Sequence, residues 1–218
     1  MTTEPGGART TVHLLRHGEV HNPHKVLYGR LPGYRLSDLG EAMAARAAAH
    51  LAGSDIALVV SSPLERAQQT ATPVAAKHAL PIELDERVIE SGNKFEGHRV
   101  GVGDGALANP KYWKWLYNPF TPSWGEPYAE VAERVLLAVE DARERARGHE
   151  ALIVSHQLPI WIARLRVEGR RLWHDPRRRQ CSLASITSLH YVGNRLTSLS
   201  YTEPSADLLP EASKVAGA

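Results

Sequence analysis

The chain is poor in the residue types that mark several protein classes. Cys181 is the only cysteine among 218 residues, so neither an intrachain disulfide nor a multi-cysteine metal site can form, as in a reducing compartment. The longest apolar stretch near the N-terminus, around Val12 to Leu15, is too short for a signal-peptide core or a membrane span. We therefore expect a cytoplasmic protein that does not bind membranes.

An excess of charge of one sign is also lacking. The 26 Lys and Arg residues against 24 Asp and Glu residues leave a net charge of +2, which is too small to predict nucleic-acid binding. A local excess occurs at residues 164–179, with seven Arg against Glu168 and Asp175. An RNA or polyanion patch would fit this segment, but Trp173 offers little base stacking, so a solvated helix end and loop is favoured.

What is present is the composition of a folded chain. Hydrophobic residues make up 43% and charged residues 23%, which allows a sizeable core. Residues 1–10 and 203–218 are small, polar and without periodicity, so we expect flexible termini around a single domain at residues 11–202. The sequence does not define the oligomeric state, and a homodimer remains open.

Short apolar runs alternate with helical patterns along this domain. Buried strands are expected at Thr11–Leu15, Ile56–Val60 and Ala151–Val154. Helices are expected after Ser37, from the capping box Ser62–Glu65 to His78, from Glu126 towards Gly148, and over Pro159–Glu168. A strand pair is expected at 184–191 and 196–201. This alternation predicts an α/β fold, a three-layer sandwich whose central, mainly parallel sheet is flanked by helices.

Polar and ionisable residues follow each of the three expected strands. These are Arg16 and His17 after the first, Ser61, Ser62 and then Arg66 after the second, and Ser155 and His156 after the third. Because the carboxyl ends of parallel strands line the ligand crevice, two histidines and two arginines should converge there. Arg66 falls in the first turn of its helix, where free backbone N–H groups favour an anion. The pattern favours a phosphoryl group as the ligand.

These residue types suit phosphoryl transfer. A neutral imidazole is a competent nucleophile near neutral pH. Two guanidinium groups supply paired donors that offset the charge on the phosphoryl oxygens. Gly18, directly after His17, is expected to let the backbone approach the phosphate without a Cβ in the way.

Four motifs occur in order along residues 11–201. They are Leu14-Leu15-Arg16-His17-Gly18-Glu19, Leu36-Ser37-x-x-Gly40, Ser61-Ser62-Pro63-Leu64-x-Arg66-Ala67-x-x-Thr70 and Val154-Ser155-His156. In combination they resemble the histidine phosphatase superfamily, also called phosphoglycerate mutase-like. The resemblance implies a metal-independent phosphomonoesterase that needs no cofactor, works through a phosphohistidine and takes a small phosphorylated substrate.

The resemblance also implies roles for the matching residues. His17 would be the phosphorylated nucleophile, while Arg16, Arg66 and His156 would hold the phosphoryl oxygens. The family also uses an acidic residue that protonates the leaving oxygen and later activates water. Glu90 is the best match for this residue. Glu86 is the reserve candidate.

The chain departs from the family pattern at three places. Asn22 stands five positions after the nucleophile, where the family usually has Asn six after, and is still expected to reach the phosphate. Gln157 follows His156, where Gly is common, and would alter the donors near the site. The mutases carry Glu-Arg-His-Tyr-Gly where this chain has Glu90-Ser91-Gly92-Asn93-Lys94, so a phosphatase is favoured. A mutase-type phosphotransferase and a weakly catalytic protein that binds phosphorylated ligands or RNA are the alternatives.

Half of the aromatic residues lie between Tyr112 and Tyr128, within an expected insertion at 98–125. As a lid, this segment would bring Trp113 and Trp115 to the substrate, and the alternative is a hydrophobic cluster beneath a long loop. The histidines at 13, 17, 21 and 24 have a spacing that would suit metal ligands on a helix. The preceding strand, Gly18 and Pro23 argue against that helix, so no metal site is expected.

Overall fold

A six-stranded mixed sheet forms the centre of the fold. The structure is a computed structural model that describes residues 7–99 and 124–212. The strands are β1 (Arg9–Arg16), β2 (Ile56–Ser61), β3 (Ile82–Leu84), β4 (Glu150–Ser155), β5 (Ile186–Val192) and β6 (Arg195–Thr202), in the spatial order β3-β2-β4-β1-β5-β6. The first four strands of this order are parallel, and β5 and β6 are antiparallel to their neighbours. The expected mainly parallel sheet is confirmed.

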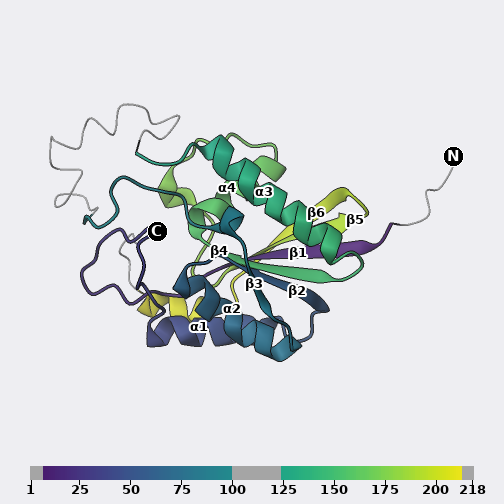
Figure 1. Cartoon of the computed structure of the whole chain (residues 1–218), viewed down its shortest axis with the longest axis horizontal. Coiled ribbons are helices and arrows are strands. Elements are labelled where there is room, and N and C mark those ends of the chain that lie inside the picture. The colour runs from purple at the N-terminus through teal and green to yellow at the C-terminus, as the bar shows by residue number, and fades with distance from the viewer. Residues whose placement is uncertain (1–6, 100–123, 213–218) are drawn as a thin grey trace.

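Helices cover both faces of the sheet. Helices α1 (Asp38–His50) and α2 (Glu65–His78) lie on one face, and α3 (Tyr128–Arg145) and α4 (Gln157–Val167) lie on the other (Figure 1). Successive residues of β4 are apolar because both faces of the strand are buried. Ile153 packs in the cluster with α3 and α4, while Leu152 and Val154 pack in the cluster with α1 and α2. The three-layer sandwich is therefore confirmed.

The two helices on the first face begin differently. The Ser37 side chain accepts a hydrogen bond from the Gly40 N–H at 3.0 Å and caps α1, as expected. Helix α2 begins at Glu65 without a side-chain cap, so the expected capping box from Ser62 is wrong. The Ser62 hydroxyl lies instead 2.8 Å from Nε2 of His156, a residue on another strand end. Ser62 keeps one local contact, accepting from the Leu64 N–H at 3.4 Å, and adds this long-range one.

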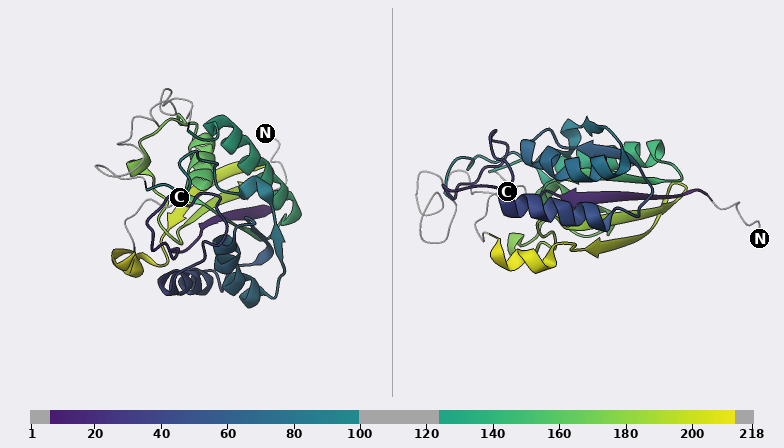
Figure 2. Two further views of the ribbon diagram at one scale, coloured as in Figure 1. Left: turned by 60° about the vertical axis from the view of Figure 1, so that its left-hand side comes forward. Right: turned by 90° about the horizontal axis from the view of Figure 1, so that it is seen from below.

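Regular structure extends beyond the expected domain bounds of 11–202 at both ends. Strand β1 begins at Arg9 and Thr10 is buried, two residues before the expected start. Residues 206–211 form a 3₁₀ helix, next to α1 in Figure 2, beyond the expected end. Leu208 and Leu209 of this helix pack against the cluster with α1 and α2. Residues 213–218 lie outside the described residues.

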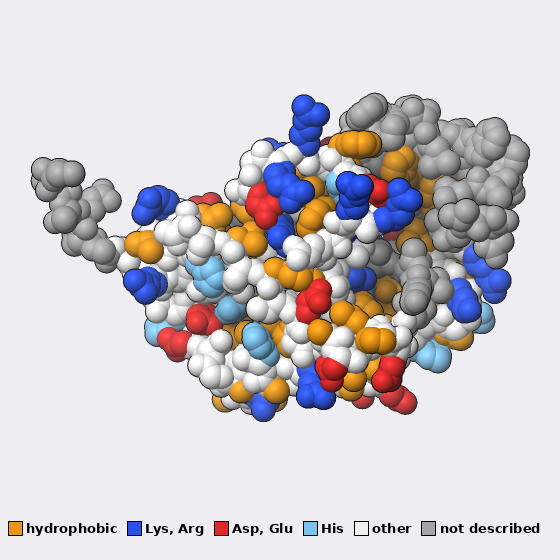
Figure 3. Space-filling model, turned by 180° about the vertical axis from the view of Figure 1, so that it is seen from behind, with side chains coloured by type: hydrophobic (Ala, Val, Ile, Leu, Met, Phe, Trp, Pro, Cys, Tyr) orange, Lys and Arg blue, Asp and Glu red, His pale blue; other side chains and the backbone are white. Residues whose placement is uncertain are grey.

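The basic segment at 164–179 is partly neutralised by its own acids. Arg164 and Arg170 each contact Glu168, at 2.9 and 2.8 Å, and Arg177 contacts Asp175 at 2.8 Å. Acidic and basic side chains are also interspersed on the face shown in Figure 3.

Among the residues that the structure describes, no helix has both the length and the apolar character that a bilayer crossing requires.

Candidate active site

Three neighbouring strands bring the site residues to one edge of the sheet. In the register, Arg16 on β1 pairs with Ser155 on β4. The ladder continues past the strand ends, since the His17 N–H donates to the Ser155 carbonyl at 3.1 Å and the Ser62 N–H to the Val154 carbonyl at 2.9 Å. The rings of His17 and His156 consequently lie with their centroids 5.1 Å apart.

His17 is fully buried and held in one tautomer. Its Nδ1 lies 2.7 Å from the Gly18 carbonyl oxygen, which can only accept, so the proton is on Nδ1 and Nε2 carries a lone pair. Nε2 has no hydrogen-bond partner among the described residues. Burial holds the pKa of His17 well below its ordinary value, and the charges of Arg66 and Arg16 lower it further. The imidazole is thus neutral, with its nucleophilic nitrogen unengaged.

Two guanidinium groups are anchored beside the histidines. Arg16 donates from Nη1 to the Cys181 carbonyl at 2.7 Å, and Arg66 donates from Nη2 to the Gly29 carbonyl at 2.6 Å. Arg66 also lies over the Tyr28 ring, 4.7 Å from its centroid. In both arginines Nε is buried without a partner among the described residues, where neither forms an ion pair. Each group is therefore fixed by a neutral contact and keeps donors for an anion.

His156 contacts Ser62, a residue that the sequence analysis assigned to a helix cap. The Ser62 hydroxyl accepts from the Leu64 N–H at 3.4 Å and lies 2.8 Å from Nε2 of His156. Nδ1 of His156 is buried and unpartnered among the described residues, and it carries the imidazole proton in the tautomer in which Ser62 donates to Nε2. Burial lowers the pKa of His156 well below its ordinary value, with Arg66 adding to the effect. His156 is thus a neutral imidazole held by Ser62.

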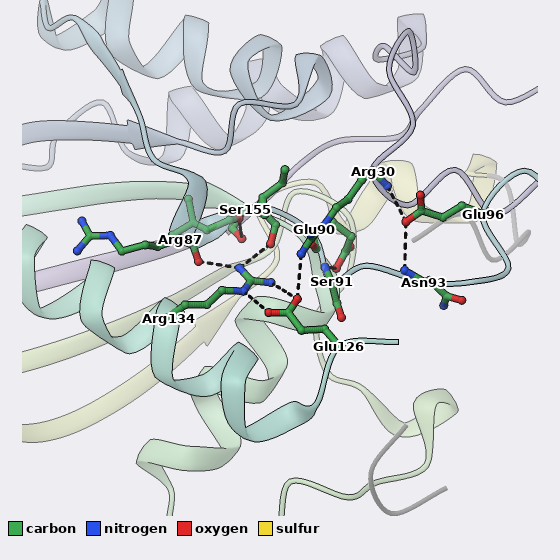
Figure 4. Close-up of polar contacts among 11 residues, drawn as sticks. Arg30, Arg87, Glu90, Ser91, Asn93, Glu96, Glu126, Arg134 and Ser155 are labelled. Carbon is green, nitrogen blue, oxygen red and sulfur yellow. Dashed lines mark hydrogen bonds and ion pairs between the residues drawn. The ribbon is translucent and has the colours of Figure 1, made fainter. Parts of the chain in front are cut away.

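Glu90 is the buried carboxyl of the site. Its Oε1 accepts the Ser91 N–H at 2.8 Å, and its Oε2 has no partner among the described residues. Burial raises the pKa of Glu90, and the nearby charges of Arg66 and Arg16 only partly oppose this rise. Glu86, the reserve candidate, is exposed on the preceding 3₁₀ helix. Figure 4 shows the segment that carries Glu90 surrounded by Arg30, Arg134 and Glu126.

Gly18 has no room for a side chain. A Cβ on Gly18 would overlap the Gly40 carbonyl oxygen, and a Cβ on Gly40 would overlap the Glu19 carbonyl oxygen. The loop after β1 therefore touches the first turn of α1 backbone to backbone. This contact requires glycine at both positions, and the approach of a phosphate to Gly18 stays a prediction.

The remaining expected site residues lie in different surroundings. Asn22 folds back on Val26, donating to its carbonyl at 2.8 Å and accepting from its N–H at 3.2 Å, so its amide is occupied within the loop. Gln157 donates to the Cys181 carbonyl at 3.4 Å and accepts from Arg179 at 3.3 Å. Their contacts with substrate stay predictions. Trp113, Trp115 and most of the expected lid lie outside the described residues.

Arg179 is a further cation that sequence reasoning did not single out. Its described hydrogen-bond partners are neutral, because Nε donates to Nε2 of His174 at 2.9 Å and Nη1 donates to Gln157. It lies close enough to Glu90 to lower the pKa of that carboxyl. The only signal in the sequence was its membership of the Arg-rich segment, which does not distinguish it from its neighbours.

Metal-binding side chains are not grouped in the parts of the chain that the structure describes, where no three of His, Cys, Asp and Glu are placed to share an ion. The site there consists of two neutral histidines, two anchored guanidinium groups and one buried carboxyl at the carboxyl edge of the sheet. These features define a class of α/β proteins with an anion site built on histidine and arginine.

The chain belongs to the histidine phosphatase superfamily (branch 1), whose family model matches residues 12–204. Rv0525 of Mycobacterium tuberculosis is 59% identical over 197 residues, which are 90% of this chain and 98% of that protein. The structure of Bacillus stearothermophilus YhfR has a TM-score of 0.71 at 26% identity, covering 86% of this chain and 94% of that one. Mycobacterial glucosyl-3-phosphoglycerate phosphatase Rv2419c has a TM-score of 0.66 at 25% identity, covering 84% and 90%. The resemblance noted in the sequence is confirmed.

Proposed function

We propose that this protein hydrolyses small phosphomonoesters through a phosphohistidine on His17, without a metal or other cofactor. The observation that carries the proposal is the buried Nε2 of His17, which has no partner among the described residues, in an imidazole close enough to Arg66 and Arg16 for both charges to lower its pKa. Membership of the superfamily and the similarity to a structure named as a phosphatase support hydrolysis.

In the first step, Nε2 of His17 attacks phosphorus in line with the leaving oxygen. The N–P bond forms as the P–O bond breaks, and the carboxyl of Glu90 gives its proton to the departing oxygen. The raised pKa of Glu90 favours the protonated form that this step needs. The Nε donors of Arg16 and Arg66 and the Nδ1 donor of His156 would offset charge on the phosphoryl oxygens.

In the second step, the Glu90 carboxylate takes a proton from water as that water attacks phosphorus. The N–P bond breaks, its electron pair returns to Nε2, and inorganic phosphate leaves. His17 is again neutral and Glu90 again protonated. One ester and one water have become one alcohol and one phosphate.

Hydrolysis of an aryl phosphate in excess EDTA tests the proposal, using the wild type, His17→Ala and the exposed-site control His21→Ala. We expect wild-type and control activity to survive chelation and the His17 variant to lose about three orders of magnitude or more. Acid-labile phosphate should appear on the wild-type protein during turnover. An active His17 variant, or a wild type silenced by EDTA, would refute the proposal.

A further inference from the structure

The carboxyl proposed as the acid has no side-chain partner of its own among the described residues. Oε1 of Glu90 accepts only the N–H of the next residue, Ser91, and Oε2 is unpartnered. The residue lies outside every helix and strand. The position of the Glu90 carboxyl therefore depends on the contacts that hold the backbone around it.

The carbonyl groups of that backbone are held by side chains from elsewhere in the fold. Four consecutive carbonyl groups, those of Arg87, Val88, Ile89 and Glu90, accept hydrogen bonds from side chains. Arg134 on α3 donates from Nη1 to the first and third carbonyls, at 2.7 and 2.8 Å. Ser155 donates to the second at 2.7 Å, and Arg30 donates from Nε to the fourth at 2.6 Å.

Glu126 joins the two arginines of this arrangement. Its Oε1 accepts from Nε of Arg134 at 2.7 Å, and its Oε2 accepts from Nη2 of Arg134 and from Nη2 of Arg30, both at 2.9 Å (Figure 4). Its own N–H donates to the Gly92 carbonyl at 3.2 Å. The Glu126 carboxylate thus pairs with two guanidinium groups, and both of these donate to carbonyls of the Glu90 segment. The Glu126 backbone also contacts that segment, at Gly92.

We propose that Glu126 is a positioning residue, which sets the place of the Glu90 carboxyl by aligning Arg134 and Arg30 on the carbonyls around it. The inference rests on the proposed role of Glu90 as the proton donor. Proton transfer requires the donor within hydrogen-bond reach of the leaving oxygen, so a small displacement of the backbone reduces the rate of this transfer. Binding of the phosphoryl group uses other residues and is not affected directly.

The dependence of rate on the leaving group tests this role. We expect Glu126→Gln to lower kcat/KM for alkyl phosphates by roughly ten- to a hundredfold, because a poor leaving group needs the proton. An aryl phosphate with an acidic phenol should lose about twofold at most, since its oxygen departs without protonation. The control is Glu133→Gln, an exposed position on α3. In the Glu90→Gln background, Glu126→Gln should cause no further loss.

A second readout does not need catalysis. The Ser91 amide donates to the Glu90 carboxyl, so its hydrogen exchange reports on whether that carboxyl stays in place. Exchange should be about tenfold faster or more in Glu126→Gln and in Arg134→Lys, and unchanged in Glu133→Gln. An equal loss on alkyl and aryl esters, or an unchanged Ser91 amide, would overturn the positioning role. If wild-type hydrolysis proves independent of His17 while Ser91 exchange still responds, the proposed function fails and the positioning of the carboxyl stands.

Discussion

At the scale of single residues, burial moves the pKa values of the proposed acid and the proposed nucleophile in opposite directions. The ordinary values are 4.5 for Glu and 6.5 for His. Burial raises the pKa of Glu90 and lowers that of His17, because each charged form loses hydration. Both shifts increase the fraction of protein in which Glu90 is protonated while His17 is neutral.

The pH profile should report these two shifts. His17 must be neutral, so activity is lost as pH falls through its lowered pKa; Glu90 must be protonated, so activity on alkyl esters is lost as pH rises through its raised pKa. We expect Glu90→Gln to lose about a hundredfold in kcat/KM and to lack the alkaline decline. Glu86→Gln should keep the wild-type profile. A normal profile in the Glu90 variant, measured from initial rates, would point to another acid.

Arg179 allows a matched comparison with the residue beside it. Its guanidinium has neutral described partners and lies near Glu90, whereas Arg178 is exposed on the surface. We expect Arg179→Gln to weaken the binding of inorganic phosphate by about three- to tenfold, because a partly buried cation near the site is lost. Arg178→Gln removes the same charge and should change the affinity little. Calorimetric titration would compare them, and equal affinities would separate Arg179 from the site.

At the scale of elements, the contact between the β1–α1 loop and the start of α1 leaves no room for a Cβ. Gly18 and Gly40 face each other there, and this is the physical reason for glycine at both positions. The position of His17 is therefore coupled to the position of α1, and the hydrogen bond from the Ser37 hydroxyl to Oε2 of Glu19 at 2.6 Å joins the same two segments.

Gly40→Ala should accordingly damage both stability and activity. We expect a loss of about 1–3 kcal/mol in the free energy of unfolding, because the backbone segments must separate to accept the methyl group. Gly53→Ala, where an added Cβ meets no atom within 4 Å, should change stability by about 0.5 kcal/mol or less. Urea unfolding would measure both. If the two variants are equally stable, the β1–α1 loop accepts the added methyl group without a loss in the free energy of unfolding.

At the scale of the whole molecule, the segment after β6 packs against the hydrophobic cluster that includes α1 and α2. Leu208 and Leu209 pack against the cluster there, and Arg46 on α1 forms an exposed ion pair with Asp207 at 3.2 Å. The apolar contacts matter more than this pair, since exposed ion pairs contribute little.

Shortening the chain tests the contribution of this segment. A chain ending at Pro204 should be about 2 kcal/mol less stable than one ending at Ala212, from the burial of two leucines. Thermal unfolding should then show a midpoint lower by roughly 4–8 °C. Coinciding midpoints for the two chains would mean that the segment rests on the surface without stabilising it.

The sequence predicts the elements that have strong local signals. The apolar runs and the expected strand pair predict five of the six described strands, and Ser37 predicts the start of α1, whereas β3 has only three residues and no periodic pattern. The sequence also predicts that His17 and His156 lie close together, because each directly follows a strand and the two strands end at the same edge of the parallel sheet. It does not predict Ser62, whose local pattern resembles a cap, or Arg179, which arrives from a loop. Such contacts depend on distant segments that local patterns do not encode.

The position of β4 has a consequence for how the protein is made. Strand β4 lies between β1 and β2, yet it leaves the ribosome about ninety residues after β2, so a nascent chain carries two strands with an empty place between them. Both facing edges stay unpaired, and His17 and Ser62 stay apart, until β4 arrives. His17 can therefore be buried only after β4 has been synthesised, and the exposed edges are where misassembly or chaperone binding would begin.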